Sequence, residues 1–205
     1  MNRALIAAII VVVAIAALAA AVLTSTAPEP APAPAASTPA PAAPEGRFVA
    51  LSGADFSTVA PVDGKGQPAD MAPYRGKALL VNLWATWCAP CIQELPSLGK
   101  LQQDLGGDKF QVVTIAIDER DPAKIEPFLA AHGAGNLPTL IDLNRTIDTV
   151  AQVSALPTSL LVDSDGKVKA MLSGDARWNC GKALEAVKAF VADGTVNQDV
   201  LDPCE

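Results

Sequence analysis

A predicted strand that runs directly into a predicted helix, with two cysteines at the junction, constrains the fold of this chain most. The strand is the apolar run 78–81, which is too short for a helix and apolar enough to be covered on both faces. The helix opens at Cys88 and carries leucines three and four positions apart, the spacing of one buried helical face. They are Leu95, Leu98, Leu101 and Leu105. We therefore expect stretch 81–91 to join the central strand of a domain to its cysteine-bearing helix.

Cys88 and Cys91 lie three positions apart on one helical turn, so their thiols can close a small disulfide ring. Cys88 falls where unpaired backbone N–H groups and the positive end of the helix dipole favour a thiolate. A Cys-x-x-Cys pair beside a βαβ pattern favours a redox dithiol. The alternatives are a permanent disulfide and half of a zinc site. A zinc site needs about four ligands, and Cys180 and Cys204 do not form a second close pair.

The N-terminal residues 1–23 predict a transmembrane anchor. Residues 4–23 are apolar without a charge and follow Arg3, and a helix of this length spans roughly 30 Å. The positive flank places the N-terminus in the cytoplasm and the rest of the chain across the membrane. A cleaved signal peptide is the alternative, although its apolar core is usually about 7–15 residues long. Both interpretations place the cysteines in an oxidising compartment.

Residues 24–46 are rich in alanine and proline and predict a linker rather than a core. Alternating prolines favour an extended polyproline conformation of about 3.1 Å per residue, so this segment is expected to be a semi-rigid tether. The remaining residues 47–205 form the predicted domain. The net charge of −7 and the pI near 4.7 argue against nucleic acid, whose phosphates need a basic surface.

The order of elements in the domain predicts an α/β fold with a central mixed sheet flanked by helices. An N-terminal hairpin is expected from a weak strand at 56–59 and turn residues at 63–66, before the central strand and cysteine helix. A strand at 110–117, a helix capped by Asp121 and a helix through Ile147, Val150 and Val153 follow. The pattern ends with a strand at 158–162, a turn at 165–166, a strand at 167–172 and a helix at about 178–192.

The motifs in this order resemble the thioredoxin superfamily, in particular its TlpA/ResA-like branch. The first signature is Trp84-Ala85-Thr86-Trp87-Cys88-Ala89-Pro90-Cys91 with Glu94-Leu95-Pro96, and the second is Leu156-Pro157-Thr158 with residues 161–166. The N-terminal anchor and the stretch 174–178 are most similar to the membrane-anchored TlpA proteins of α-proteobacteria. The resemblance covers residues 56–191 and implies a thioredoxin-like fold.

The resemblance also implies roles for individual residues. Cys88 would be the exposed nucleophile, and Cys91 the thiol that resolves the mixed disulfide. Pro157 would be a cis-proline facing both sulfurs; an ordinary trans-proline at a strand entrance is the alternative. The residues expected to face a substrate or to set the potential are Trp87, Ala89, Pro90 and Leu156, with backbone near Pro157 pairing with an extended substrate strand.

Two positions depart from the family pattern and leave the proton acceptor for Cys91 open. Asn82 stands on the central strand where many thioredoxins carry a buried aspartate, and an amide cannot titrate. Ala89 stands between the cysteines where ResA-like proteins can carry a glutamate. Glu94, one turn past Cys91, is the best candidate for a proton relay, although it could equally be a solvated helix residue.

Cys180 and Cys204 are expected to form a structural disulfide, because two spare thiols in an oxidising compartment most simply pair. The loop of about 25 residues would contribute about 3 kcal/mol in the chain-entropy model. A second redox pair or a metal site is the alternative. His132 is the single histidine, at a predicted helix end. The sequence thus predicts neither a metal site nor a cofactor.

These features predict a periplasmic, inner-membrane-anchored thiol:disulfide oxidoreductase that acts as a monomer. The resemblance implies that it reduces cysteines of cytochrome c or copper-site assembly proteins and draws electrons from an integral-membrane thiol donor. A peroxiredoxin-like thiol peroxidase is one alternative, but the threonine or serine that usually precedes the peroxidatic cysteine after a proline is absent. A Cu(I) chaperone is another, but no methionine or histidine lies nearby in sequence.

Overall fold

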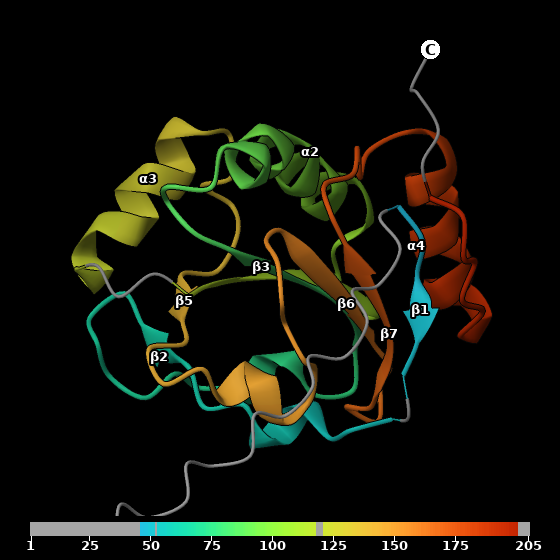
Figure 1. Ribbon diagram of the computed structural model, residues 1–205, viewed down its shortest axis with the longest axis horizontal. Helices are drawn as coiled ribbons and strands as arrows, with labels where there is room; N and C mark the ends of the chain where they lie inside the picture. Colours follow the sequence, from blue (N-terminus) through green and yellow to red (C-terminus); the bar gives the residue numbers. More distant parts are fainter. Residues whose placement is uncertain (1–45, 52, 118–120, 201–205) are drawn as a thin grey trace, which may run out of the picture. The chain divides into compact units, whose positions relative to one another are not determined.

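A computed structural model describes residues 46–51, 53–117 and 121–200 and arranges them around a seven-stranded mixed sheet (Figure 1). The strand order is β1-β7-β6-β3-β4-β5-β2. The strands are β1 (Val49–Ala50), β2 (Val62–Asp63), β3 (Ala78–Trp84), β4 (Phe110–Ala116), β5 (Leu140–Ile141), β6 (Thr158–Val162) and β7 (Val168–Ser173). β3 pairs with β4 in parallel and with β6 antiparallel, so it lies at the centre of the sheet.

The α-helices of the described residues pack on one face of the sheet: α2 (Ala89–Leu105), α3 (Ile125–Ala131) and α4 (Gly181–Asp193). Successive side chains of a strand point to opposite faces, so β3 serves two cores. Leu80 and Trp84 lie in the cluster with the helices, whereas Leu79, Val81 and Leu83 lie in a second cluster. That second cluster is closed by the 3₁₀ turns η1 (Phe56–Thr58) and η4 (Thr146–Thr149), seen below the sheet in Figure 1.

The junction between β3 and α2 follows from this arrangement. All of β3 after Ala78 is buried, as the apolar run predicted, and four residues separate its end from the start of α2. Cys88 is the N-cap of α2, and Pro90 occupies the first turn, where a missing N–H costs no helical hydrogen bond. The sequence therefore places the two cysteines at the carboxyl end of the central strand.

The predicted α/β fold with a central mixed sheet and flanking helices is confirmed, but its N-terminal hairpin differs from the prediction. Residues 56–58 form the 3₁₀ turn η1, capped by Asp55, instead of a strand. The turn at 63–66 is present, and a bridge between Val62 and Pro68 closes it. β2 then pairs with β5 at the sheet edge, because Val62 and Asp63 lie opposite Ile141 and Leu140.

Two predicted helices are shorter in the structure. The helix expected through Ile147, Val150 and Val153 is reduced to the turn η4, where the buried Asp142 carboxylate accepts hydrogen bonds from the N–H groups of Thr146 and Ile147. The last helix begins at Gly181 rather than near Trp178, with Cys180 as its N-cap. Residues 174–180 are consequently a non-helical segment between β7 and α4.

None of the helices formed by the described residues is long and apolar enough to cross a membrane. The predicted anchor, 1–23, and almost all of the predicted linker, 24–46, lie outside the described residues. Cys204 also lies outside them, so its pairing with Cys180 stays a prediction.

Candidate active site

The candidate active site is a disulfide between Cys88 and Cys91 at the N-terminus of α2. The two sulfurs are 2.02 Å apart. The backbone N–H of Cys91 also donates to Sγ of Cys88 at 3.3 Å. The same donor and the positive end of the helix dipole would stabilise a thiolate on Cys88 once the bond is reduced.

The solvent exposures of the two cysteines differ less than the sequence predicted. Cys88, expected to be exposed, has 5% of its surface accessible, and Cys91 has none. Their order still matches the predicted roles, because an incoming disulfide can reach only the more accessible sulfur. Trp87, by contrast, is 65% exposed, the largest value among the bulky apolar side chains described, and the first-turn residues Ala89 and Pro90 are exposed. Contact between these residues and a substrate stays a prediction.

The peptide bond between Leu156 and Pro157 is cis, so the alternative of a trans-proline is wrong. Pro157 is buried immediately before β6. Leu83 on β3 lies opposite Thr158 on β6, and an antiparallel register places Pro157 beside Trp84 at the carboxyl end of β3. Pro157 therefore reaches the strand end that leads into the cysteines, whereas its contact with both sulfurs stays a prediction.

Glu94 is a buried acid rather than a solvated helix residue, with 3% of its surface exposed. Asn82 donates from Nδ2 to Oε1 of Glu94 at 2.6 Å and to Ser159 Oγ at 3.0 Å. Trp178 donates from its indole Nε1 to Oε2 of Glu94 at 3.1 Å, and the backbone N–H of Ala176 donates to the same oxygen at 3.3 Å. Both carboxyl oxygens therefore have donors.

The pKa of Glu94 is raised from 4.5 to about 7, because burial removes the carboxylate from water. Hydrogen bonds from Asn82, Trp178 and Ala176 oppose this effect, and the charge of Asp175 adds slightly to it. Glu94 lies three residues after Cys91 on α2, so both side chains point from the same face of the helix. The arrangement brings a carboxyl group that titrates near neutral pH to the same side of the helix as the buried cysteine.

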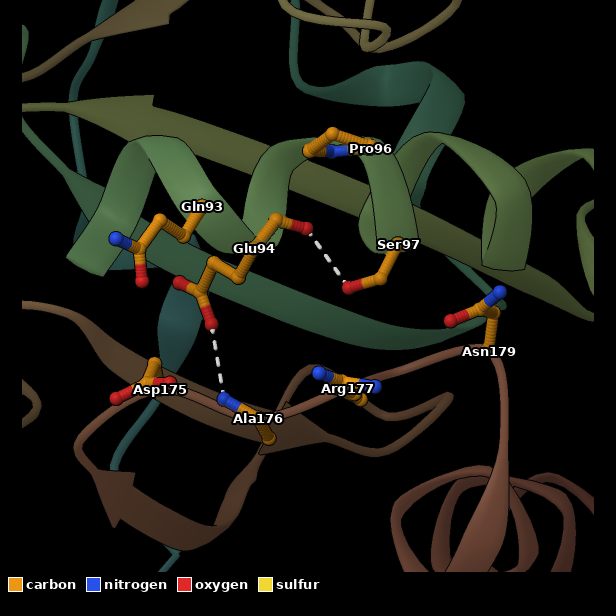
Figure 2. A pocket seen from close by; sticks show the side chains of 8 residues that line it. All are labelled: Gln93, Glu94, Pro96, Ser97, Asp175, Ala176, Arg177 and Asn179. Carbon is orange, nitrogen blue, oxygen red and sulfur yellow. Dashed lines mark hydrogen bonds between the residues drawn. The ribbon is translucent and has the colours of Figure 1, made fainter. Parts of the chain in front are cut away.

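A pocket of about 530 Å³ opens next to Glu94, between α2 and residues 175–179 (Figure 2). Its lining includes Gln93, Pro96 and Ser97 from the helix. In Figure 2 the Glu94 side chain extends from α2 toward the backbone of Ala176. The pocket gives solvent a route to the neighbourhood of a carboxyl group that is otherwise buried.

Comparison with known proteins agrees with this geometry. A family model described as the AhpC/TSA family matches residues 52–171, more than half of the chain. The chain belongs to this family. The thiol-disulfide oxidoreductase ResA of Bacillus subtilis (strain 168) is 28% identical over 122 residues, covering 60% of this chain and 67% of that protein. ResA of Bacillus thuringiensis (strain Al Hakam) is 32% identical over 113 residues, covering 55% of this chain and 64% of that protein. About a third of each relative thus lies outside the match.

Solved structures support the same branch. The chain is 26% identical to a Chlorobium tepidum protein provisionally described as the thiol:disulfide interchange protein DsbE, with a TM-score of 0.58 over 69% of this chain and 99% of that one. The thioredoxin domain of a thiol-disulfide oxidoreductase from Bacteroides vulgatus, at 21% identity and a TM-score of 0.55, supports the fold. Together with the Cys88–Cys91 disulfide, these similarities identify a thioredoxin-like thiol-disulfide oxidoreductase of the TlpA/ResA-like branch.

Sequence reasoning missed three groups that hold Glu94: the indole of Trp178, the N–H of Ala176 and, through Asn82, the hydroxyl of Ser159. The sequence predicts Trp178 at the start of the last helix, which in the structure begins at Gly181. The sequence does indicate that Glu94 is buried, because it shares the helical spacing of Cys91, Leu95 and Leu98, which form one buried face of α2. An acid on such a face is expected to be buried.

Proposed function

We propose that this protein is a reductant of protein disulfides, acting through the Cys88–Cys91 dithiol at a membrane surface. The observation that carries the proposal is the disulfide at the N-terminus of α2, with a raised-pKa carboxyl group one turn away. A purely structural disulfide would need neither a position at the N-terminus of a helix nor a buried carboxyl group such as Glu94 beside it. Similarity to proteins named thiol-disulfide oxidoreductase ResA supports the chemistry.

In the forward reaction the reduced protein attacks a disulfide of its substrate. The Cys88 thiolate forms a bond to one substrate sulfur, and the other substrate sulfur leaves as a thiolate and takes up a proton. The Cys91 thiolate then attacks Sγ of Cys88, forming the observed disulfide and releasing the second substrate sulfur. Two electrons pass from the dithiol to the substrate disulfide, so the protein ends in the oxidised state that the structure shows.

Glu94 would accept the proton of Cys91 in the second step. Cys91 has no exposed surface, so water cannot deprotonate it directly. A base is most effective when its pKa lies near the working pH, which the value of about 7 for Glu94 provides. The proton would then pass to solvent through the pocket beside Glu94.

The proposed location and partners rest on the sequence and on the resemblance. The apolar segment 4–23 would anchor the chain in the inner membrane, and the linker 24–46 would hold the domain in the periplasm. The substrates would be disulfide-containing proteins of cytochrome c or copper-site assembly. Because each turnover oxidises the dithiol, an integral-membrane thiol donor would have to reduce it again.

Reduction of insulin disulfides by the full chain tests the chemistry. We expect Cys88→Ser to reduce the rate to background, because the attacking sulfur is lost. Gln103→Ser, an exposed change further along α2, is the control and should retain the activity. Full activity in Cys88→Ser would contradict the proposal.

Trapping of mixed disulfides tests the direction and the partners. Cys91→Ser leaves Cys88 able to attack but removes the resolving thiol, so a bound substrate cannot be released. We expect the trapped proteins to include ones with paired cysteines that bind haem or copper. Capture of thiol-oxidising proteins alone would argue against a reductive role.

A further inference from the structure

Trp178 lies in a segment whose side chains alternate between the protein interior and the solvent. Ala176 and Trp178 are buried, whereas Asp175, Arg177 and Asn179 are exposed and line the pocket of Figure 2. This alternation is typical of extended chain. It directs Trp178 toward α2 and leaves charged groups at the pocket.

Two hydrogen bonds tie Trp178 to the helical turn that carries Glu94. The indole Nε1–H donates to Oε2 of Glu94 at 3.1 Å. The backbone N–H of Trp178 donates to Ser97 Oγ at 3.2 Å, and Ser97 Oγ donates in turn to the carbonyl oxygen of Glu94 at 2.8 Å. Trp178 therefore contacts the side chain of Glu94 directly and its main chain through Ser97.

Trp84 shows that burial of an indole in this protein does not require such a partner. Trp84 and Trp178 both have 0% of their surface exposed. Within the described part of the chain, Nε1 of Trp84 has no hydrogen-bond partner, although its ring stacks on Phe128. The indole of Trp178 also packs against an aromatic ring, that of Phe48, but its N–H is directed to a buried acid.

We propose that Trp178 is a positioning residue for the thiol chemistry, holding one oxygen of Glu94 from residues 174–180 while Asn82 holds the other from β3. The carboxyl group is thereby fixed one helical turn beyond Cys91. This inference rests on the proposed role of Glu94 as the proton acceptor. It assigns to the loop after β7 a part in the reaction, although that loop contains no reacting atom.

The charged and titratable groups around Glu94 determine what a test can measure. α2 contributes Cys88 and Cys91, which do not titrate while they are disulfide-bonded. β3 and β6 contribute the neutral Asn82 and Ser159. Residues 174–180 contribute Asp175, whose charge raises the pKa of Glu94, and Arg177 at the pocket. Among these groups Glu94 is the one whose pKa is raised to about 7, so its titration is followed at its own carboxyl carbon.

The first test uses the unaltered full chain, oxidised and in mild detergent, and follows indole N–H signals by NMR as the pH changes. The chain has three tryptophans, so each signal can be assigned by single substitution. We expect the indole N–H signal of Trp178 to shift with pH at the same midpoint as the carboxyl carbon of Glu94. The indole N–H signal of Trp84 should not show this midpoint. A Trp178 signal that is constant while Glu94 titrates would overturn the proposal.

The second test compares Trp178→Phe with Trp84→Phe. Each change removes an indole N–H from a side chain with 0% exposure, but only the first removes a donor to Glu94. Loss of a hydrogen bond to a charged acceptor should raise the Glu94 midpoint by about one pH unit in Trp178→Phe. Equal Glu94 midpoints in the two variants would contradict the positioning role of Trp178.

The pH profile of disulfide reduction separates this inference from the function on which it rests. Trp178→Phe should shift the profile to higher pH by the same amount as the Glu94 midpoint, and Trp84→Phe should not shift it. If Glu94→Gln leaves the profile unchanged, the proton role of Glu94 is wrong. If Glu94→Gln changes the profile and Trp178→Phe does not, the role of Trp178 is wrong and that of Glu94 stands.

Discussion

Glu94 connects the dithiol to groups that are distant in sequence. Its carboxyl oxygens accept hydrogen bonds from Asn82 on β3 and from Trp178 after β7, 12 positions before it and 84 after it. Burying a carboxylate is unfavourable unless donors compensate, and burial here remains the larger effect on its pKa. A buried acid with a raised pKa beside a reactive group is a common feature of active sites.

Replacing Glu94 by glutamine is predicted to slow disulfide reduction by about 10²-fold, because general-base catalysis typically contributes that much or more. Glutamine preserves the size of the side chain but cannot accept the proton of Cys91. The measurement is the rate of insulin reduction between pH 5 and 9. Glu185→Gln is the control, since the Glu185 side chain is 68% exposed on α4. Equal rates for the two variants would contradict a role for Glu94.

The sequence predicts the disulfide-bonded cysteines and the cis-proline but not the groups that hold Glu94. Cys88, Cys91 and Pro157 could be located because each belongs to a local motif. The amide of Asn82 cannot titrate, and its hydrogen bond to Glu94 depends on how α2 packs on β3. Trp178 and Ser159 could not be assigned, because contacts over 77 or more positions follow from the register of the sheet rather than from spacing.

At the scale of elements, the strands and the helix of the central sheet were predicted better than the short segments outside it. β4, β6, β7 and α2 lie within one residue of their predicted ranges, and β3 extends three residues beyond the predicted run 78–81. Residues 56–58 formed a 3₁₀ turn, because the Asp55 carboxylate accepts from the N–H of Ser57 and favours a cap over a strand. Such local hydrogen bonds decide between conformations that a run of three or four residues leaves open.

The packing of α2 gives a prediction about Gly99. A Cβ on Gly99 would come 2.3 Å from the carbonyl oxygen of Gly133 and 3.3 Å from Cα of Ala134. Gly99→Ala should therefore force the helix away from residues 133–136, at a cost of about 1–3 kcal/mol in the free energy of unfolding. Gly107→Ala is the control, since its Cβ would meet no atom within 4 Å. Denaturant unfolding of the oxidised protein measures both, and equal stabilities would show that this close approach is not needed.

At the scale of the whole molecule, the raised pKa of Glu94 links the stability of the fold to the state of the site. The folded protein holds the Glu94 proton up to about pH 7, whereas a solvated carboxyl group loses it near pH 4.5. Between these values the folded state binds more protons than the unfolded state. The free energy of unfolding must then fall as the pH rises through this window.

We predict that Glu94→Gln removes this loss of stability. The full shift in the pKa of Glu94 corresponds to a loss of the order of 3 kcal/mol in the free energy of unfolding between pH 4.5 and pH 7.5. Urea unfolding of the oxidised full chain at several pH values measures it, and the comparison of wild type with Glu94→Gln cancels the contribution of the exposed carboxylates. The oxidised form is needed because reduced cysteines would add their own titrations. The wild type should lose stability relative to the variant as the pH rises, and parallel curves would show that Glu94 ionises in the folded protein as it does in water.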